Sequence, residues 1–185
     1  KMIDVFSSEA PIVVGAIVLF SLFIVSLLLK APVPENTNEH QQVSIWHKIN
    51  TPVFYAFLLS AALLQLSFGP YYGFFALYVL ELGYSGQATG WLIALGVLAE
   101  VVIFLQAGKL ITLFGVKWIL VTSILLTALR WYLLAIAANN PAILILSQAL
   151  HAFSFGMTHA ASMHFIHHYF GSKFQSQGQA IYISV

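Results

Sequence analysis

Five long apolar runs dominate this sequence, and each is long enough to cross the hydrocarbon core of a membrane, which takes about 20 residues. The runs cover 10–30, 51–80, 88–108, 118–138 and 142–168, and a sixth begins near Gln175. None of them alternates polar and apolar residues as a membrane barrel strand does. We therefore predict an all-α membrane protein, built as a polytopic helical bundle.

Composition supports a chain whose main partner is the lipid bilayer. Charged residues make up only 7% of the 185 residues, against about 25% in soluble domains. The net charge of +1 leaves no basic patch for phosphates, so no nucleic-acid partner is expected. Cysteine is absent, which excludes disulfide scaffolds and thiolate chemistry. The last residues, QAIYISV, stop inside an apolar run, and we expect the chain to be a piece of a longer protein.

The positions of the lysines predict the orientation in the membrane. If the spans alternate, one side of the membrane receives five lysines, namely Lys30, Lys48, Lys109, Lys117 and Lys173. The other side receives only Lys1. Cytoplasmic loops carry an excess of Lys and Arg, so the lysine-rich side is predicted to be cytoplasmic. The polar segment 31–50 and the loop 109–117 would then lie on the cytoplasmic side of the cell inner (plasma) membrane.

Two full charges, Glu100 and Arg130, lie inside the spans, together with the ionisable His151. At the helical rise, Glu100 and Arg130 lie about 12 and about 20 Å from the cytoplasmic end of their spans, and His151 about 14 Å from the outer end. A charge at mid-membrane costs about 2.5–3.5 kcal/mol on insertion scales. Three such groups on consecutive spans at similar depth are therefore predicted to converge on one polar cavity.

Two interpretations of these charges stay open. Glu100 and Arg130 could form a structural pair that holds two helices together, because paired charges are the usual ionisable residues of a membrane interior. Alternatively they form a substrate and proton site, to which His151 adds a group that titrates near neutral pH.

The fifth span places polar residues and one aromatic on a single helical face: Gln148, His151, Phe155, Thr158 and His159. That face suits a water-lined pathway, or interhelical hydrogen bonds worth about 0.6 kcal/mol each.

The second span contains Gly69-Pro70, which should kink or break its helix. Broken helices in transporters expose backbone at binding sites. The aromatic residues that follow, Tyr71, Tyr72, Phe74 and Phe75, could line such a site or face the lipid.

An enzyme is the alternative from another class. His164, His167 and His168 have the HxxHH spacing of a histidine box in membrane di-iron desaturases. One box cannot hold two irons, and interfacial histidines explain the same pattern. No GxSxG, HExxH or P-loop sequence is present, so we expect neither an enzyme nor a metal or other cofactor.

Several stretches together resemble the major facilitator superfamily, specifically its 3-phenylpropionate/proton symporter group. They are YYGFFALYVLELGYS (71–85), LGVLAEVVIF (95–104), LRWYL (129–133) and SQALHAFSFGMTHAASM (147–163). The segment GKLITLFGVK (108–117) is similar to the superfamily loop GxxxDRxGxK, with Thr112 and Leu113 where Asp and Arg are expected.

The resemblance implies a fragment of a twelve-helix major facilitator fold, namely helices 6 to 10 and the start of helix 11. Residues 1–30 would contain the last helix of the N-terminal half, and 31–50 would be the cytoplasmic central loop. Residues 51–185 would form an incomplete C-terminal transmembrane bundle. The remaining N-terminal half is then an expected partner of this chain.

The resemblance also implies a proton-coupled secondary transporter that works by alternating access on a small organic substrate. In the related lactose permease group, an Arg and a His belong to the proton-coupling site, and Arg130 and His151 match them. That group has a Glu one turn after the His, where this chain has Ser154, so Glu100 becomes the candidate proton carrier.

In this interpretation Glu100 and His151 couple protons, and Arg130 holds a substrate carboxylate with two parallel hydrogen bonds. An aromatic carboxylate such as a phenylpropionate would also contact the remaining candidates, Tyr71, Tyr72, Trp131 and Gln148. The runner-up is a membrane helical scaffold that transports nothing.

Overall fold

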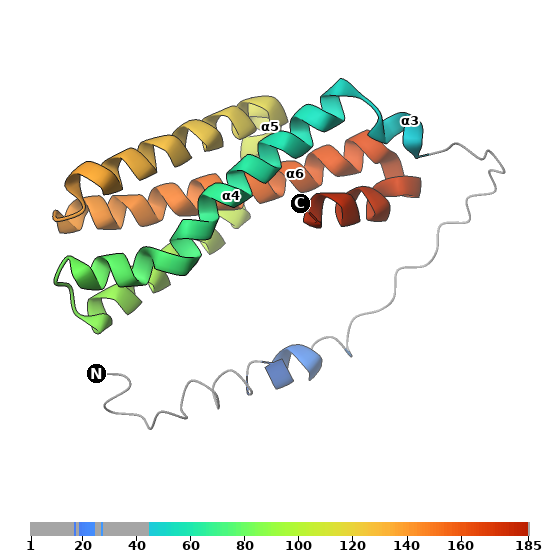
Figure 1. Ribbon diagram of the computed structural model, residues 1–185. Helices are drawn as coiled ribbons and strands as arrows, with labels where there is room; N and C mark the ends of the chain where they lie inside the picture. The colour runs from blue at the N-terminus through green and yellow to red at the C-terminus, as the bar shows by residue number, and fades with distance from the viewer. Residues whose placement is uncertain (1–16, 18, 25–26, 28–44, 185) are drawn as a thin grey trace. The chain divides into compact units, whose positions relative to one another are not determined.

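A computed structural model describes residues 17, 19–24, 27 and 45–184 of the chain. The described residues form four numbered helices, α3 (Trp46–Ile49), α4 (Pro52–Glu81), α5 (Gly86–Ala137) and α6 (Pro141–Ile183) (Figure 1). They contain no strand, so the all-α prediction is confirmed for this part of the chain. Within the expected span 10–30, the described residues are helical, and its remaining residues lie outside the described ones, as do 31–44 of the expected central loop.

The chain divides into two units, Lys1–Val43 and Ser44–Val185, and the functional candidates all lie in the second. Three helices of this unit, α4, α5 and α6, are long and apolar enough to cross a membrane. The short helix α3 stands just before α4, and it includes Lys48 of the segment expected to be a polar linker.

Helix α5 consists of two arms. Its 52 residues would extend about 78 Å as one straight helix, which is more than twice the hydrocarbon thickness of about 30 Å. Gly115 interrupts the helical dihedral angles with φ 75° and ψ 155°, a conformation almost restricted to glycine. The arms are 86–114 and 116–137, and the chain turns back between them in Figure 1. They correspond to the predicted third and fourth spans.

Helix α6 is divided in the same way by Gly171, at φ 69° and ψ 176°. The first arm, 141–170, corresponds to the predicted fifth span, and the second, 172–183, to the start of the sixth. In Figure 1 the second arm folds back beside the first. The Tyr182 ring of this second arm lies 5.8 Å from the ring of Phe57 in α4. The second arm therefore also packs against α4.

The sequence analysis predicted a loop at 109–117, and this prediction is wrong. The structure continues the helix through these residues and departs from helical angles only at Gly115. The physical reason is that 109–114 contains neither glycine nor proline. The hydroxyl of Thr112, which could compete with the helix backbone, instead donates to the carbonyl of Gly108 inside the helix, at 2.8 Å.

Helix α4 passes through Gly69-Pro70 without a break, while its ribbon changes direction along its length in Figure 1. Its start is defined by Thr51, whose side chain accepts a hydrogen bond from the backbone of Phe54, and by Pro52 in the first turn. The kink expected at Pro70 is therefore a bend in a continuous helix, and the alternative of a broken helix is not found.

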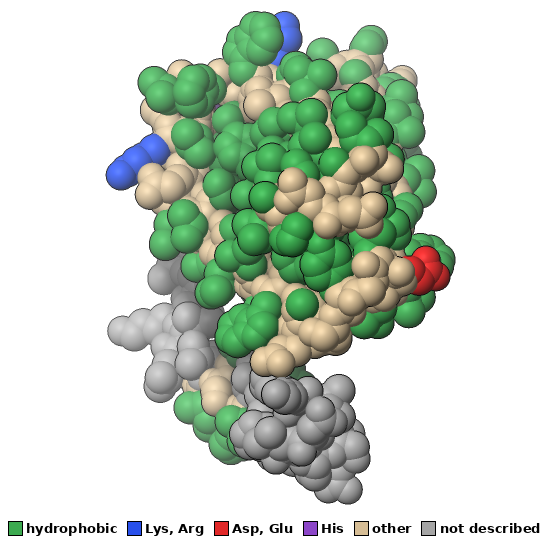
Figure 2. Space-filling view, turned by 90° about the vertical axis from the view of Figure 1, so that its left-hand side faces the viewer, with side chains coloured by type: hydrophobic (Ala, Val, Ile, Leu, Met, Phe, Trp, Pro, Cys, Tyr) green, Lys and Arg blue, Asp and Glu red, His purple; other side chains and the backbone are tan. Residues whose placement is uncertain are grey.

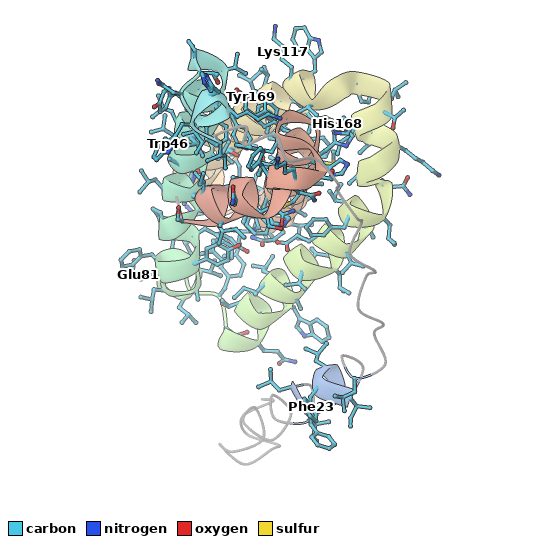
Figure 3. All side chains as sticks on the ribbon, turned by 90° about the vertical axis from the view of Figure 1, so that its right-hand side faces the viewer. Phe23, Trp46, Glu81, Lys117, His168 and Tyr169 are labelled. Atoms are coloured by element: carbon cyan, nitrogen blue, oxygen red, sulfur yellow. The ribbon has the colours of Figure 1, made fainter. Side chains whose placement is uncertain are left out.

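The outer surface and the two ends of the second unit differ in chemistry. Figure 2 shows a face covered mostly by hydrophobic side chains, which suits contact with lipid tails. Trp46, Lys117, His168 and Tyr169 lie toward one end in Figure 3, and Glu81 lies toward the opposite end. This separation agrees with the two sides of the membrane inferred from the lysines.

Candidate functional site

Arg130 and His151 form the centre of the candidate site. Arg130 comes from the second arm of α5 and is 0% exposed, and His151 comes from α6 and is 1% exposed. Arg130 Nη1 lies 2.8 Å from His151 Nδ1. A guanidinium can only donate, so Nδ1 must accept. The ring proton of the neutral imidazole is therefore on Nε2.

Glu100 extends this contact to a third helical segment. His151 Nε2 lies 3.5 Å from Glu100 Oε1, on the first arm of α5, and the glutamate side chain is 20% exposed. In the described part of the chain, no direct ion pair joins Glu100 to Arg130. His151 lies between Glu100 and Arg130, with Nε2 toward the glutamate and Nδ1 toward the arginine. The structure therefore brings together the three groups that the sequence placed at similar depth.

Aromatic rings surround the guanidinium of Arg130. Its Cζ lies 4.9 Å from the ring centroid of Tyr71, 4.9 Å from that of Trp131 and 5.8 Å from that of Phe68. Cations bind to such ring faces, and more strongly where water is excluded. Arg130 Nε and Nη2 have no hydrogen-bond partner in the described residues. The side of the guanidinium that carries two parallel donors is thus buried and unused.

Tyr71 is held by Gln148. The Tyr71 hydroxyl donates to Gln148 Oε1 at 2.7 Å, and the ring of Tyr71 lies 4.0 Å from that of His151. Gln148 is 0% exposed, and its Nε2 donates to the hydroxyl of Ser147 at 3.3 Å. Gln148, predicted from the sequence as a substrate contact, therefore lies behind Tyr71.

A cavity of about 230 Å³ opens beside these residues. Its walls are Tyr71, Tyr72, Phe75, Ala76, Ile93, Val97, Glu100 and His151. Of the sequence-predicted site residues, Arg130, Trp131 and Gln148 are not among these walls. Tyr72 contributes a side chain that is largely exposed, within ring contact of Tyr71 and His151.

Other polar residues of α6 are placed differently from the expected pathway. Thr158 is buried, whereas His159 is exposed, with its ring 6.2 Å from that of Phe104. Ser154, at the position where the lactose permease group has a Glu, donates to the carbonyl of Leu150 in its own helix at 2.8 Å. His164, His167 and His168 are exposed. The described residues contain no cluster of three or more His, Cys, Asp or Glu side chains that could hold a metal ion.

Two residues of the site were missed by the sequence analysis. Phe68 packs edge-on against His151 with ring centroids 5.3 Å apart, and it lies three residues before Tyr71, on the same helical face. Gly96 lies one turn before Glu100, and a Cβ at this position would meet Gln148 Oε1 at 2.9 Å. Helical spacing from the chosen residues could have identified both as neighbours of the site.

Chemically, the arrangement offers a carboxyl and an imidazole that can exchange protons, beside a fixed cation with two free donors. The aromatic rings add an apolar surface on which a flat ligand could stack.

Comparison with known proteins adds an independent finding. The sequence matches the family described as "MFS_1 like family" over residues 1–185. It is 29% identical, over 187 aligned residues, to a protein of Escherichia coli (strain K12) named "Probable 3-phenylpropionic acid transporter". The alignment covers 100% of this chain and 49% of that protein, so the chain spans about half the length of this curated relative. No solved structure matches the chain.

Proposed function

The chain belongs to the MFS_1 like family, and from that membership we propose that it forms part of a proton-coupled transporter of a small aromatic carboxylate. Membership confirms the resemblance to the major facilitator superfamily and places the chain in a transporter, not an enzyme. The iron-enzyme interpretation of His164, His167 and His168 is therefore wrong. The helices and the family together make it a multi-pass membrane protein.

The unused edge of Arg130 is the observation that carries the proposal of a carboxylate substrate. Nε and Nη2 are parallel donors, buried and without a partner in the described residues, and this geometry fits the two oxygens of a carboxylate. An unsatisfied buried donor costs about 1–3 kcal/mol, which a bound carboxylate would recover. The rings of Tyr71 and Trp131 beside the guanidinium favour an acid with an aromatic group. The name of the Escherichia coli relative supports a phenylpropionate.

Glu100 is the proposed proton carrier, with His151 as its partner. Burial favours the neutral form of a carboxyl, and a nearby cation favours the charged form. During alternating access, water would reach Glu100 from one side of the membrane and then from the other. The distance between the Glu100 carboxyl and Arg130, which His151 separates, would also change. The side chain could then take up a proton on one side and release it on the other.

The working transporter is proposed to need more helices than this chain supplies. The chain corresponds to about half the length of the relative, and the cavity beside Glu100 is open rather than enclosed by the described residues. An N-terminal half would supply the other cavity wall, with residues 1–30 as its last helix, 31–50 as the central loop and 51–185 as the C-terminal bundle. The proposed location is the inner (plasma) membrane, with 31–50 and 109–117 on the cytoplasmic side.

The test is substrate-driven proton flux in vesicles that contain the purified full-length protein. We expect 3-phenylpropionate to enter with protons, reported by a pH dye trapped inside, and to accumulate when the outside is more acidic. The uncharged amide of the same acid should not drive proton flux. Protein-free vesicles correct for passive entry of the weak acid. A full-length protein that gives no flux above this background would contradict the proposal and favour the scaffold.

A further inference from the structure

Tyr71 separates Arg130 from the cavity. Arg130 is 0% exposed and does not line the cavity of about 230 Å³, whereas Tyr71 does. The same tyrosine ring lies 4.9 Å from Arg130 Cζ on one side and 4.0 Å from the His151 ring on another. A carboxylate that enters the cavity therefore meets Tyr71, while the guanidinium of Arg130 lies buried behind the cavity walls.

Gln148 fixes Tyr71 in this position from a fully buried site. The hydrogen bond from the Tyr71 hydroxyl to Gln148 Oε1, at 2.7 Å, joins α4 to α6 at the depth of the candidate site. Gly96 makes room for the amide, since a Cβ there would lie 2.9 Å from Gln148 Oε1. The amide is also held by Ser147, so its carbonyl oxygen is oriented before the tyrosine binds it.

We propose that Tyr71 is a gate over Arg130, and that Gln148 is the positioning residue that holds this gate closed. The inference rests on the proposed function, because it concerns how an aromatic carboxylate reaches Arg130. Opening breaks the Tyr71–Gln148 hydrogen bond and removes the tyrosine ring from the guanidinium. An aromatic substrate can replace that ring on the cation, whereas an aliphatic acid cannot, so the gate also selects for aromatic acids.

Two substitutions remove the hydrogen bond while nearly preserving volume, Tyr71→Phe and Gln148→Met. Each destabilises the closed gate, because the first deletes the donor and the second leaves the tyrosine hydroxyl without its acceptor. A net hydrogen-bond contribution of the usual size then predicts that the apparent dissociation constant for the acid falls about two- to tenfold. The double variant should gain no more than the better single variant, because both changes remove the same bond.

The experiment measures binding of 3-phenylpropionate and of its uncharged amide to the purified full-length protein by titration calorimetry. Tyr78→Phe is the matched control, because the Tyr78 hydroxyl also leaves α4 to bind another helical segment, at the carbonyl of Leu134, 2.9 Å away. Tyr78 does not line the cavity. We expect acid binding to tighten more than amide binding in the two gate variants, with no change for either ligand in the control.

The outcomes separate the gate from the proposed function. Suppose that Arg130→Lys weakens binding of the acid, while Tyr71→Phe and Gln148→Met leave it unchanged or weaker. The gate is then wrong and the carboxylate site stands. If the wild-type protein does not bind the acid, or if Arg130→Lys has no effect, both proposals are overturned. Tyr71→Phe keeps the ring and its packing, so it provides a folded variant even if the buried Gln148→Met does not.

Discussion

The environment of Arg130 follows from the cost of placing its charge inside a membrane. An arginine at mid-membrane costs about 2.5–3.5 kcal/mol on insertion scales, so its helix turns it away from lipid. Buried polar residues precede it at spacings of four and three, Ser123 and Thr127, and mark the same inward face of α5. His151 and the aromatic rings then offset part of the desolvation. Two of the Arg130 donors have no hydrogen-bond partner among the described residues, which is the feature that a purely structural role leaves unexplained.

The first prediction concerns Glu100→Gln in the full-length protein. Glutamine keeps the size and hydrogen bonding of a protonated glutamate but cannot release a proton. Uphill accumulation driven by a pH gradient should be lost, while exchange of substrate across the membrane remains. The reason is that the substrate-loaded transporter changes conformation with residue 100 in its neutral form, which glutamine imitates. The measurement compares pH-gradient uptake with counterflow of the same substrate in reconstituted vesicles.

Wild-type protein in the same vesicles is the control for reconstitution. If Glu100→Gln still concentrates substrate against its gradient, Glu100 is not the proton carrier. The contact with His151 would then be structural, as the first interpretation of the sequence allowed.

Arg130→Lys should behave differently, since lysine keeps the charge and loses the planar fork. Losing one of two charge-assisted hydrogen bonds predicts that binding of an aromatic acid weakens about 10- to 100-fold. Exchange and accumulation should fall together, in contrast to Glu100→Gln. Counterflow over a range of substrate concentrations measures the change, with the uncharged amide as the comparison ligand. An equal loss of binding affinity for the acid and for the amide would mean that Arg130 does not bind the carboxylate.

The sequence predicted the three ionisable residues of the site, but not how their neighbours are arranged. Depth along a span can be calculated from residue numbers, and it brought Glu100, Arg130 and His151 to one level. The direction of Gln148 depends on the space left by the missing side chain of Gly96 and on the hydroxyl of Tyr71, two residues in other helical segments. Such pairings are set by how the helices pack, and no pattern within one span contains that information.

At the scale of helices, two glycines determine where the chain turns. The apolar runs predicted the ends of the spans in α4, α5 and the first arm of α6 within two residues, except at 108, where the helix continues to 114. Gly115 and Gly171 take positive φ values that L-residues rarely adopt, and the helices continue up to them on both sides. A sequence search for spans predicted the long apolar helices and missed the helical character of 109–114.

The second break predicts a large effect for Gly171→Ala. A side chain at φ 69° and ψ 176° strains the backbone by about 1–3 kcal/mol, so the variant should be destabilised by that amount. Gly73→Ala is the control, because Gly73 lies within α4, has no positive φ, and a Cβ there would meet nothing within 4 Å. It should be neutral or more stable by about 0.5–1 kcal/mol. Thermal unfolding of the detergent-purified proteins measures both, and equal midpoints would contradict the strain at Gly171.

Lys48 has a function at this scale that its charge alone did not suggest. Its Nζ donates to the carbonyls of Tyr169 at 3.0 Å and Phe170 at 2.9 Å, the last two residues of the first arm of α6. In return the Tyr169 hydroxyl donates to the carbonyl of Lys48 at 2.9 Å. A cation at a helix C-terminus satisfies orphan carbonyls and opposes the helix dipole. The segment before α4 is thus attached to the end of α6.

At the scale of the whole molecule, the sequence was most informative, because the bilayer leaves few choices. Backbone groups in hydrocarbon must be satisfied within the span, so long apolar runs become helices with little influence from local detail. The all-α class followed from that constraint, and it is confirmed for the described residues. The family resemblance followed from motifs in the second to fifth apolar runs, and it is also confirmed. The orientation and the division into halves remain predictions, because they depend on the membrane and on chain beyond the described residues.

The orientation gives the last prediction, which uses the absence of cysteine from this chain. Lys117 and Glu81 lie toward opposite ends of the unit in Figure 3, so single cysteines at these positions report on opposite sides of the membrane. In a full-length protein cleared of other cysteines, Lys117→Cys should react with a membrane-impermeant maleimide only in inside-out vesicles. Glu81→Cys should react only in intact cells, because the lysine-rich side is drawn to the cytoplasm. The reverse pattern would place 109–117 outside, and the proton gradient would then act on Glu100 from the opposite direction.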